Sequence, residues 1–469
     1  MRVSLLGAML ANNRVIVVAA ITLAIAVCVK LLRRGSAETH KRGVVVCDGA
    51  ALNRRAPRFR RSNGEQLALV GVPLRLRDET KHFKIIGTTG AGKSTAIRDL
   101  LAAALERGDR AVFADPDGGY RARFFERYRG DTILNPFEAN SVKWDPFSEI
   151  HNAYDVEQLA SGLIPSSSDP SASEWRAYAR TLLCALLRGG CGKRRNDCAE
   201  LWRLLSTASS DELKPIVAGT PAQPFLEPEN TRMFGSIRSV AVSAIAAFEH
   251  VAKQRAAPFS ICEWVRRKSS AGSLFIPYKA AQIPALRSLI AAWMRLAIFE
   301  AMNGEEGGDQ RLWFVIDELD ALGAIDGLKD ALSRLRKFGG RCVLGFQSIA
   351  QVSSTYGAGD AQTIVENCGS TLILRCSASE NGGTSQFASR LIGEREILRR
   401  QISRGSDRES AFGRRGARRS KNSSEQHVTE AAVMPSQIEQ LPDFCGYLKS
   451  ASAREWRRVS FERLKPHRV

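Results

Sequence analysis

The chain has 469 residues and a formal net charge of +19 at neutral pH. A chain of this length is too long for a single ordinary hydrophobic core. The positive charge favours a polyanionic partner, with nucleic acid the leading candidate, or an anionic membrane surface. Excess Lys and Arg can also simply solvate the protein surface. The ten cysteines are scattered without C-x-x-C pairs or histidine partners, which argues against a disulfide framework or a zinc site and indicates reduced thiols.

An apolar segment lies near the N-terminus. Residues 15–29 are apolar except for Thr22, and two leucines extend the run past Lys30. We expect one transmembrane helix at about 15–32, within a membrane anchor at 1–34. A cleaved signal peptide would look similar, but secretion would export the nucleotide site predicted further along the chain. Basic residues from Lys30 to Arg42 follow the run and predict a cytoplasmic main body.

A glycine-rich segment follows the short apolar strand at 84–86 and precedes a helix predicted to end near Arg107. In this G-x-x-x-x-G-K-S pattern, backbone N–H groups and the helix N-terminus bind phosphate oxygens. The lysine reaches the β and γ phosphates, and the serine ligates Mg²⁺. We therefore predict a site for ATP and Mg²⁺, with Lys93 catalytic and Ser94 a metal ligand. The nucleotide-binding residues are Gly87, Thr88, Thr89, Gly90, Ala91, Gly92, Lys93, Ser94 and Thr95.

The middle of the chain changes from alternating strands and helices to helices alone. A strand at 110–114 after the first helix marks a βαβ unit and a parallel sheet. Residues 155–268 then have apolar positions at helical spacing, with helices expected at 173–188, 199–208 and 231–251. The sheet resumes with a strand at 273–278 and a helix at about 282–302. We predict an all-α domain at 155–268, inserted between two parts of a nucleotide-binding domain, 35–154 and 269–469.

A second apolar strand, 312–316, ends in two carboxylates. A buried strand of a parallel sheet delivers such residues to the carboxyl edge of the sheet, where the phosphate loop also lies. We predict that Asp317 holds Mg²⁺ and that Glu318 orients the attacking water, so that the site hydrolyses its nucleotide.

Two further residues follow in the next helix and strand. The strand at 342–346 ends at Gln347, a candidate sensor of the γ phosphate, although a simple strand-end amide is the alternative. Arg336 and Lys337 end the helix predicted at 327–338, where the helix dipole favours cations in any case. From the residues alone, a catalytic and a purely structural role of Arg336 stay equally open.

The segment from Arg395 to Lys421 is rich in arginine, with glycine and serine between the charges. We expect a flexible loop between sheet elements there, either simply solvated or in contact with nucleic acid. Phe412 is its only aromatic residue, which argues against a platform for stacked bases.

Several segments together resemble conjugative coupling proteins of the TraD/TrwB type. The segments are HFKIIGTTGAGKST, ADPDGGY, ILNPF with WDPF, FVIDELDAL, LSRLRKFGGRCVLGFQSIAQVSSTYG and LPDFCGYLK. The resemblance covers nearly everything from Arg42 onward. It implies an α/β fold, with a RecA-like P-loop NTPase domain built on a parallel sheet, an inserted all-α domain and an N-terminal transmembrane helix. Members commonly have two such helices, whereas one convincing span is present here.

The resemblance also implies a function. Proteins of this family form homohexameric rings in the bacterial inner membrane, link relaxase-bound DNA to the proteins of a type IV secretion channel, and use ATP hydrolysis to drive single-stranded DNA transfer. Gln347 matches the family's sensor, and Arg336, in the RKFGG position, matches an arginine finger supplied to a neighbouring subunit. Two alternatives remain: a double-stranded DNA translocase of the FtsK kind, and a non-hydrolysing membrane adaptor that recruits nucleoprotein.

Overall fold

The computed structural model describes residues 39–48, 66–167, 169–190, 197–267, 272–307, 310–380, 382–406 and 419–462. The chain forms two compact units. The hairpin unit comprises Met1–Val45 and Ile392–Val433, and the main unit comprises Val46–Leu391 and Met434–Val469.

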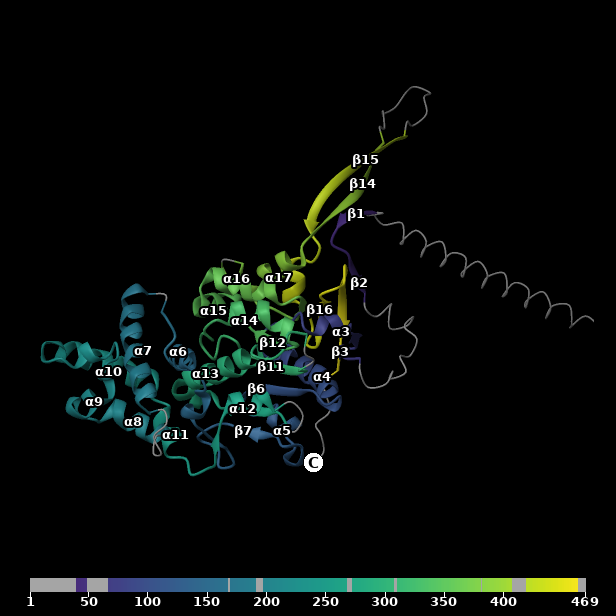
Figure 1. Cartoon of the computed structure of the whole chain (residues 1–469). Helices are drawn as coiled ribbons and strands as arrows, with labels where there is room; N and C mark the ends of the chain where they lie inside the picture. The colour runs from purple at the N-terminus through teal and green to yellow at the C-terminus, as the bar shows by residue number, and fades with distance from the viewer. Residues whose placement is uncertain are drawn as a thin grey trace, which may run out of the picture. The chain divides into compact units, whose positions relative to one another are not determined.

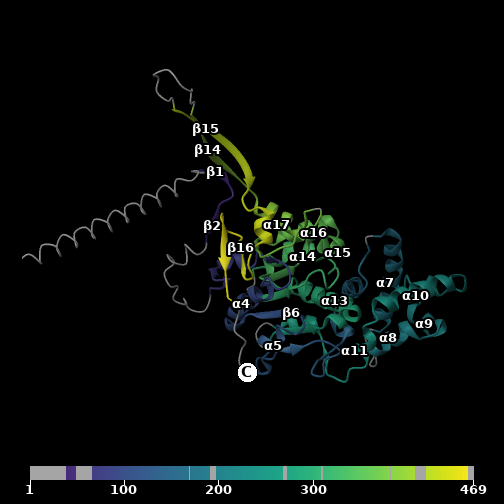
Figure 2. The same cartoon turned by 180° about the vertical axis from the view of Figure 1, so that it is seen from behind.

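The main unit is built on a ten-stranded sheet whose central strands run parallel (Figures 1 and 2). These strands consist largely of apolar residues and are buried along most of their length, as expected for a sheet covered on both faces. In spatial order they are β13 (Ser370–Ile373), β5 (Phe83–Ile86), β12 (Arg341–Phe346), β11 (Leu312–Ile316), β6 (Arg110–Pro116), β10 (Leu274–Tyr278) and β7 (Thr132–Ile133).

The last strands of the chain extend this sheet beyond β13. β16 (Cys445–Lys449) pairs antiparallel with β13, and β17 (Trp456–Ser460) pairs antiparallel with β16. β2 (Val46–Asp48) then pairs parallel with β17. Residues from the C-terminal part of the chain therefore lie two strands from β5, which precedes the phosphate loop.

Helices pack on the sheet, and the bounds of α4, α13 and α14 agree to within a few residues with the three helices that the sequence predicted in this part. The helix expected at 327–338 is α14 followed by a 3₁₀ turn at Arg336–Phe338. The helices of this part are α4 (Lys93–Glu106), α13 (Ile283–Ala301), α14 (Leu328–Leu335), α15 (Ile349–Tyr356), α16 (Ala358–Asn367), α17 (Gly383–Ile392) and α18 (Pro435–Glu439). Short elements are β3 (Ala68–Leu69), β4 (Val72–Pro73), α3 (Leu76–Glu79) and α5 (Arg121–Phe124).

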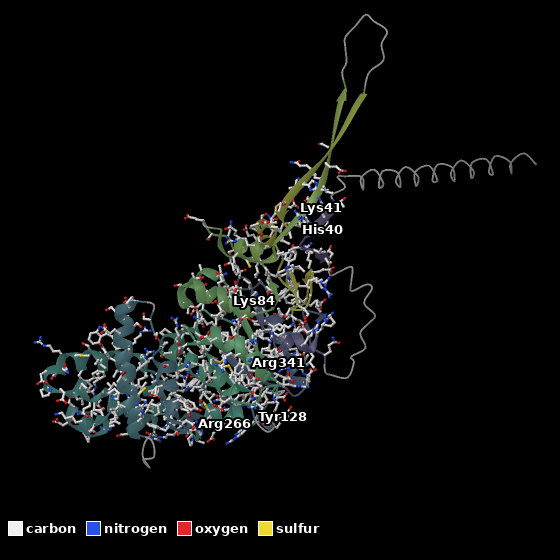
Figure 3. The ribbon with its side chains drawn as sticks, turned by 45° about the horizontal axis from the view of Figure 1, so that its top comes forward. His40, Lys41, Lys84, Tyr128, Arg266 and Arg341 are labelled. Atoms are coloured by element: carbon white, nitrogen blue, oxygen red, sulfur yellow. The ribbon has the colours of Figure 1, made fainter. Side chains whose placement is uncertain are left out.

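Buried ionic groups cross-link the amino edge of the sheet, opposite the phosphate loop. The Arg107 guanidinium pairs with Glu79 at 2.9 Å and with Asp109 at 2.5 Å. Arg341 Nε donates to the same Glu79 at 3.1 Å. On the β5 strand itself, buried Lys84 donates to the backbone carbonyls of residues 365 and 368. Figure 3 labels Lys84 and Arg341 among the side chains of the α/β part.

Helices make up most of the described residues between 153 and 266, as predicted. The helix expected at 231–251 is divided into α10 and α11 because the chain turns at 245–247. The two-residue strand β9 (Pro258–Phe259), which pairs with β8 (Lys143–Trp144), is the one strand among the described residues of this interval. The helices are α6 (Ala153–Leu163), α7 (Pro170–Gly190), α8 (Cys198–Ser206), α9 (Ser210–Val217), α10 (Thr231–Ala244), α11 (Phe248–Ala252) and α12 (Ile261–Arg266). The division of the chain into domains at residues 154 and 268 stays a prediction.

The hairpin unit corrects the expectation of a flexible loop between Arg395 and Lys421 for the two ends of that segment, whereas its middle, 407–418, lies outside the described residues. Its described residues form an antiparallel sheet of β1 (Thr39–Gly43), β14 (Glu394–Ser406) and β15 (Arg419–Ala431). β14 pairs with β15 in continuous register from Glu394 opposite Ala431 to Ser406 opposite Arg419. The prediction was wrong because the strand signal is carried by cross-strand partners far apart in sequence, whereas the local composition of arginine, glycine and serine is typical of loops.

The transmembrane helix expected at about 15–32 lies outside the described residues. Within the ranges that the structure does describe, no helix combines the length and the apolar composition needed to cross a bilayer.

Candidate functional site

The phosphate loop connects buried strand β5 to helix α4, as the sequence predicted. Gly90 and Gly92 have positive φ angles of 79° and 111°, which residues with a side chain rarely adopt. Lys93 is only 6% exposed, and its ammonium group donates to the carbonyl oxygens of Gly87 at 2.8 Å and Thr88 at 3.3 Å. The loop is thus curled around the lysine that is expected to contact phosphate.

Burial sets the electrostatics of this lysine. Removal from water lowers the pKa of Lys93, and the opposing carboxylate charges of Asp317 and then Glu318 partly restore it. An anionic phosphate would add a further opposite charge, so the lysine would gain from a bound nucleotide.

Asp317 faces the loop from the end of β11. It is 3% exposed, and its Oδ2 accepts hydrogen bonds from the Ser94 hydroxyl at 2.5 Å and the Tyr120 hydroxyl at 2.8 Å. Its Oδ1 is buried and has no hydrogen-bond partner. Gly345 on β12 permits this approach, since a Cβ there would lie 2.3 Å from the Asp317 carbonyl oxygen.

These oxygens fit the requirements of Mg²⁺. The ion prefers oxygen ligands and is usually held by one or two carboxylates together with substrate phosphates and water. Ser94 Oγ and the unpartnered Oδ1 of Asp317 offer such ligands beside the phosphate loop. Across the part of the chain that the structure describes, no group of three or more His, Cys, Asp and Glu residues could hold a metal by itself.

Glu318 and Gln347 are brought together at the same edge. Gln347 Nε2 donates to Glu318 Oε1 at 3.2 Å, and Gln347 Oε1 accepts from the Thr89 hydroxyl at 2.8 Å. The glutamine thus bridges the phosphate loop and the second carboxylate. Burial, followed by the charge of Asp317, raises the pKa of Glu318, which makes it a stronger base once ionised.

Arg336 is not brought to this edge. It is exposed in the 3₁₀ turn that precedes β12, so it lies at the amino edge of the parallel sheet, whereas the phosphate loop follows the carboxyl end of β5. Its charge contributes to the lowered pKa of His82, the residue directly before β5. The arginine is thus placed away from the nucleotide site of its own chain.

Two contacts of the site were not predicted. One is the hydrogen bond from the Tyr120 hydroxyl to Asp317. The other is Phe444, whose N–H donates to the Ala91 carbonyl at 3.0 Å, and whose ring would lie 2.9 Å from a Cβ on Gly92. Phe461 stacks edge-on against Phe444, with ring centroids 5.7 Å apart. Both segments had been singled out only for their family resemblance, and no local pattern indicates that they reach the phosphate loop.

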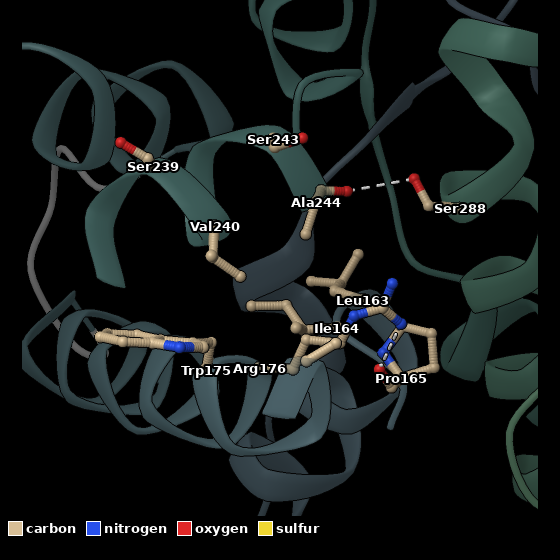
Figure 4. A pocket seen from close by; sticks show the side chains of 11 residues that line it. Leu163, Ile164, Pro165, Trp175, Arg176, Ser239, Val240, Ser243, Ala244 and Ser288 are labelled. Carbon is tan, nitrogen blue, oxygen red and sulfur yellow. Dashed lines mark hydrogen bonds between the residues drawn. The ribbon is translucent and has the colours of Figure 1, made fainter. Parts of the chain in front are cut away.

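Two of the cavities in the main unit lie beside the site and among the helices. One, of about 630 Å³, adjoins the site and is lined by Thr88, Gln347 and residues at the start of α17. The other, of about 560 Å³, lies among α6, α7, α10 and α13; Trp175 and Val240 line it, and Ser288 donates to the Ala244 carbonyl at its edge (Figure 4).

The chain is similar to several known proteins. Residues 66–462 match the family described as the type IV secretion-system coupling protein DNA-binding domain. The coupling protein TraD of Escherichia coli K12 is 28% identical over 384 residues, covering 80% of this chain and 52% of TraD. An E. coli conjugal transfer protein TraG is 24% identical over 377 residues, covering 71% of this chain and 58% of its own length. The chain thus spans about half the length of these curated relatives.

Solved structures of the plasmid coupling protein TrwB have the same fold. The unbound form aligns with a TM-score of 0.78 and 30% identity, covering 91% of this chain and 94% of that one. Two complexes, one with the non-hydrolysable ATP analogue ADPNP and one with ADP and Mg²⁺, each align with a TM-score of 0.76, 30% identity and coverage of 91% and 95%. Because the family match extends over most of its length, this chain belongs to the TraD/TrwB family of conjugative type IV secretion coupling proteins.

Proposed function

We propose that this chain is an ATPase of conjugation, anchored in the bacterial inner membrane with its main body in the cytoplasm. It forms a homohexameric ring that couples a relaxase–DNA complex to type IV secretion channel proteins and drives single-stranded DNA transfer. The observation that carries the proposal is the convergence of Ser94, Asp317, Glu318 and Gln347 on the phosphate loop. The similarity to TrwB, solved with an ATP analogue and with ADP and Mg²⁺, supports the choice of nucleotide and metal.

Each residue then has a distinct task. Residues 87–95 hold the phosphates, and Lys93 neutralises charge on the β and γ groups. Ser94 and Asp317 hold Mg²⁺, which when bound with the nucleotide neutralises developing charge on the phosphate oxygens. Glu318 orients the attacking water and accepts its proton. Gln347, held between Thr89 and Glu318, senses whether the γ phosphate is present.

Arg336 acts on the nucleotide of the neighbouring subunit. Its place at the amino edge of its own sheet supports this assignment, because only another copy of the chain could receive its guanidinium at a phosphate loop. Such a finger stabilises transition-state charge and typically accelerates phosphoryl transfer by about 10³ to 10⁵. Hydrolysis therefore depends on assembly.

The remaining parts of the proposal rest on charge and sequence. The net charge of +19 suits a channel that follows a phosphate backbone without reading bases. The helices from α6 to α12 are a candidate contact for DNA or the relaxosome. The apolar residues at about 15–32 supply the membrane anchor.

The test is the steady-state ATPase rate of the detergent-solubilised full chain, measured against protein concentration with and without single-stranded DNA at low salt. A rate per subunit that rises with both supports the ring motor. Measurable ATP binding without hydrolysis under every condition would favour the non-hydrolysing adaptor instead.

Two variants assign the roles. Lys93→Ala should abolish hydrolysis and weaken ATP binding, whereas Arg336→Ala should abolish hydrolysis with ATP binding retained. Lys337→Ala is the matched control, since Lys337 is an exposed cation in the same turn. Normal turnover by Arg336→Ala would refute the finger assignment.

A further inference from the structure

Near its end, β6 carries a buried carboxylate that accepts hydrogen bonds from the turn that follows the strand. Asp115 is fully buried, and its two oxygens accept the backbone N–H groups of Tyr120 at 2.8 Å and Arg121 at 2.7 Å. Between them the chain passes through Asp117 and Gly118, with φ angles of 55° and 68°. The carboxylate thus fixes a tight turn at the carboxyl edge of the sheet, beside β11.

This turn presents the Tyr120 side chain. The ring is 1% exposed, stacks on Phe113 with centroids 5.4 Å apart, and lies 5.3 Å from the Arg98 guanidinium carbon. A ring packed in this way has little rotational freedom. Its hydroxyl is therefore held in place where it donates to Asp317 Oδ2 at 2.8 Å.

The two hydroxyl groups that donate to Asp317, those of Ser94 and Tyr120, would respond differently to a bound metal. In the proposed function Ser94 would itself hold the metal, so its oxygen would be needed there and its hydrogen bond to Asp317 would change. Tyr120 can stay, because it belongs to neither the phosphate loop nor β11. Its hydrogen bond to an ionised carboxylate is of the stronger, charge-assisted kind. It restrains one oxygen of Asp317 and leaves the buried Oδ1 without a protein partner.

We propose that Tyr120 is a positioning residue, whose hydroxyl orients the Asp317 carboxylate so that it can bind the nucleotide-associated metal. The inference rests on the proposed function for the identity of that metal and for the role of Asp317. Groups that orient metal ligands in this way typically change metal affinity or activity by about 10- to 100-fold when removed.

The test is Tyr120→Phe, which keeps the ring stacked on Phe113 and removes only the hydroxyl. Mn²⁺, as a probe for Mg²⁺, is titrated by electron paramagnetic resonance into full-length protein saturated with ADPNP. The dissociation constant for Mn²⁺ should rise about 10-fold. ADPNP affinity without metal should stay unchanged. In ATPase assays the Mg²⁺ concentration for half-maximal rate should rise by a similar factor.

Tyr356→Phe is the control. Tyr356 is a tyrosine of α15 whose hydroxyl meets only main-chain groups, accepting the Ile325 N–H at 3.2 Å and donating to the Gly323 carbonyl at 3.4 Å. This variant should bind Mn²⁺ as the wild type does, even if both variants melt at a lower temperature. Wild-type Mn²⁺ affinity in Tyr120→Phe would overturn the inference. A wild type that binds Mn²⁺ with ADPNP but never hydrolyses ATP would instead refute the ATPase function, and the metal titration would still decide the role of Tyr120.

Discussion

His82 should make the protein less stable as the pH falls from 7 to 5. The side chain is 1% exposed at the start of β5, with Nδ1 accepting the Cys342 N–H at 3.1 Å and Nε2 donating to the Leu332 carbonyl at 2.8 Å. Only a neutral imidazole can accept a hydrogen bond at Nδ1 while it donates one from Nε2. Burial lowers the pKa of His82 to about 4; the hydrogen bond to Leu332 opposes this effect and the charge of Arg336 adds to it.

The magnitude follows from the difference between folded and unfolded pKa values. With a pKa of 6.5 when unfolded and about 4 when folded, His82 binds its proton more readily in the unfolded chain. Its contribution is therefore fully present above pH 6.5 and is lost as the pH falls toward 4. At about 1.4 kcal/mol per pKa unit the complete loss is about 3 kcal/mol, of which about 2 kcal/mol falls between pH 7 and pH 5.

The assay compares urea unfolding of the wild type and His82→Asn at pH 7 and pH 5. Asparagine tolerates the positive φ of 57° at this position, offers an oxygen to the Cys342 N–H, and does not titrate. The free energy of unfolding of the wild type should fall by about 2 kcal/mol more than that of the variant. For His151→Asn, at an exposed histidine, the free energy of unfolding should fall between pH 7 and pH 5 by as much as it does in the wild type. If the free energy of unfolding fell equally in the wild type and in His82→Asn, the assigned role of His82 would be refuted.

Two further substitutions test the packing around the site. Gly92→Ala should lower ATP affinity at least about 10-fold in equilibrium binding, because a left-handed backbone costs a residue with a side chain about 1–2 kcal/mol and the new Cβ would also meet Phe444. Gly219→Ala, also at a positive φ (75°) but with open space around it, should leave ATP affinity unchanged; an equal loss of affinity there would contradict a local effect at Gly92. Arg107→Met should lower the free energy of unfolding by about 3–5 kcal/mol, because Glu79 and Asp109 would keep buried charges without this cation. Arg203→Met, in an exposed ion-pair cluster, should leave the urea midpoint unchanged, and a comparable loss there would contradict the role of burial.

The part of the site that local patterns encode was predictable from the sequence. Residues 87–95 follow from glycine placement between a strand and a helix, and Asp317, Glu318 and Gln347 each end a predicted buried strand. Parallel strands have their carboxyl ends at the same edge of a sheet. Residues that follow such strands are therefore expected to lie close together. The observed contacts between Ser94 and Asp317 and between Gln347 and Glu318 agree with this expectation, whereas the catalytic roles of these residues remain to be measured.

The remaining contacts depend on which strands become neighbours. Tyr120 reaches Asp317 because β6 lies beside β11, and Phe444 reaches the phosphate loop because β13 places β16 close to β5. Strand order is a property of the whole sheet, and no periodicity within one segment reports it. The same limit explains the hairpin unit, where β14 and β15 stabilise each other through pairs such as Ile397 with Val428.

The contact between Phe444 and the phosphate loop has a consequence for biosynthesis. The loop is made early, but the backbone group that caps Ala91 and the ring that packs against Gly92 belong to a segment that is synthesised only after strands β6 to β13. A nascent chain that has completed only β5 and α4 lacks this support. We therefore expect the phosphate loop to acquire its final packing only after β16 has joined the sheet.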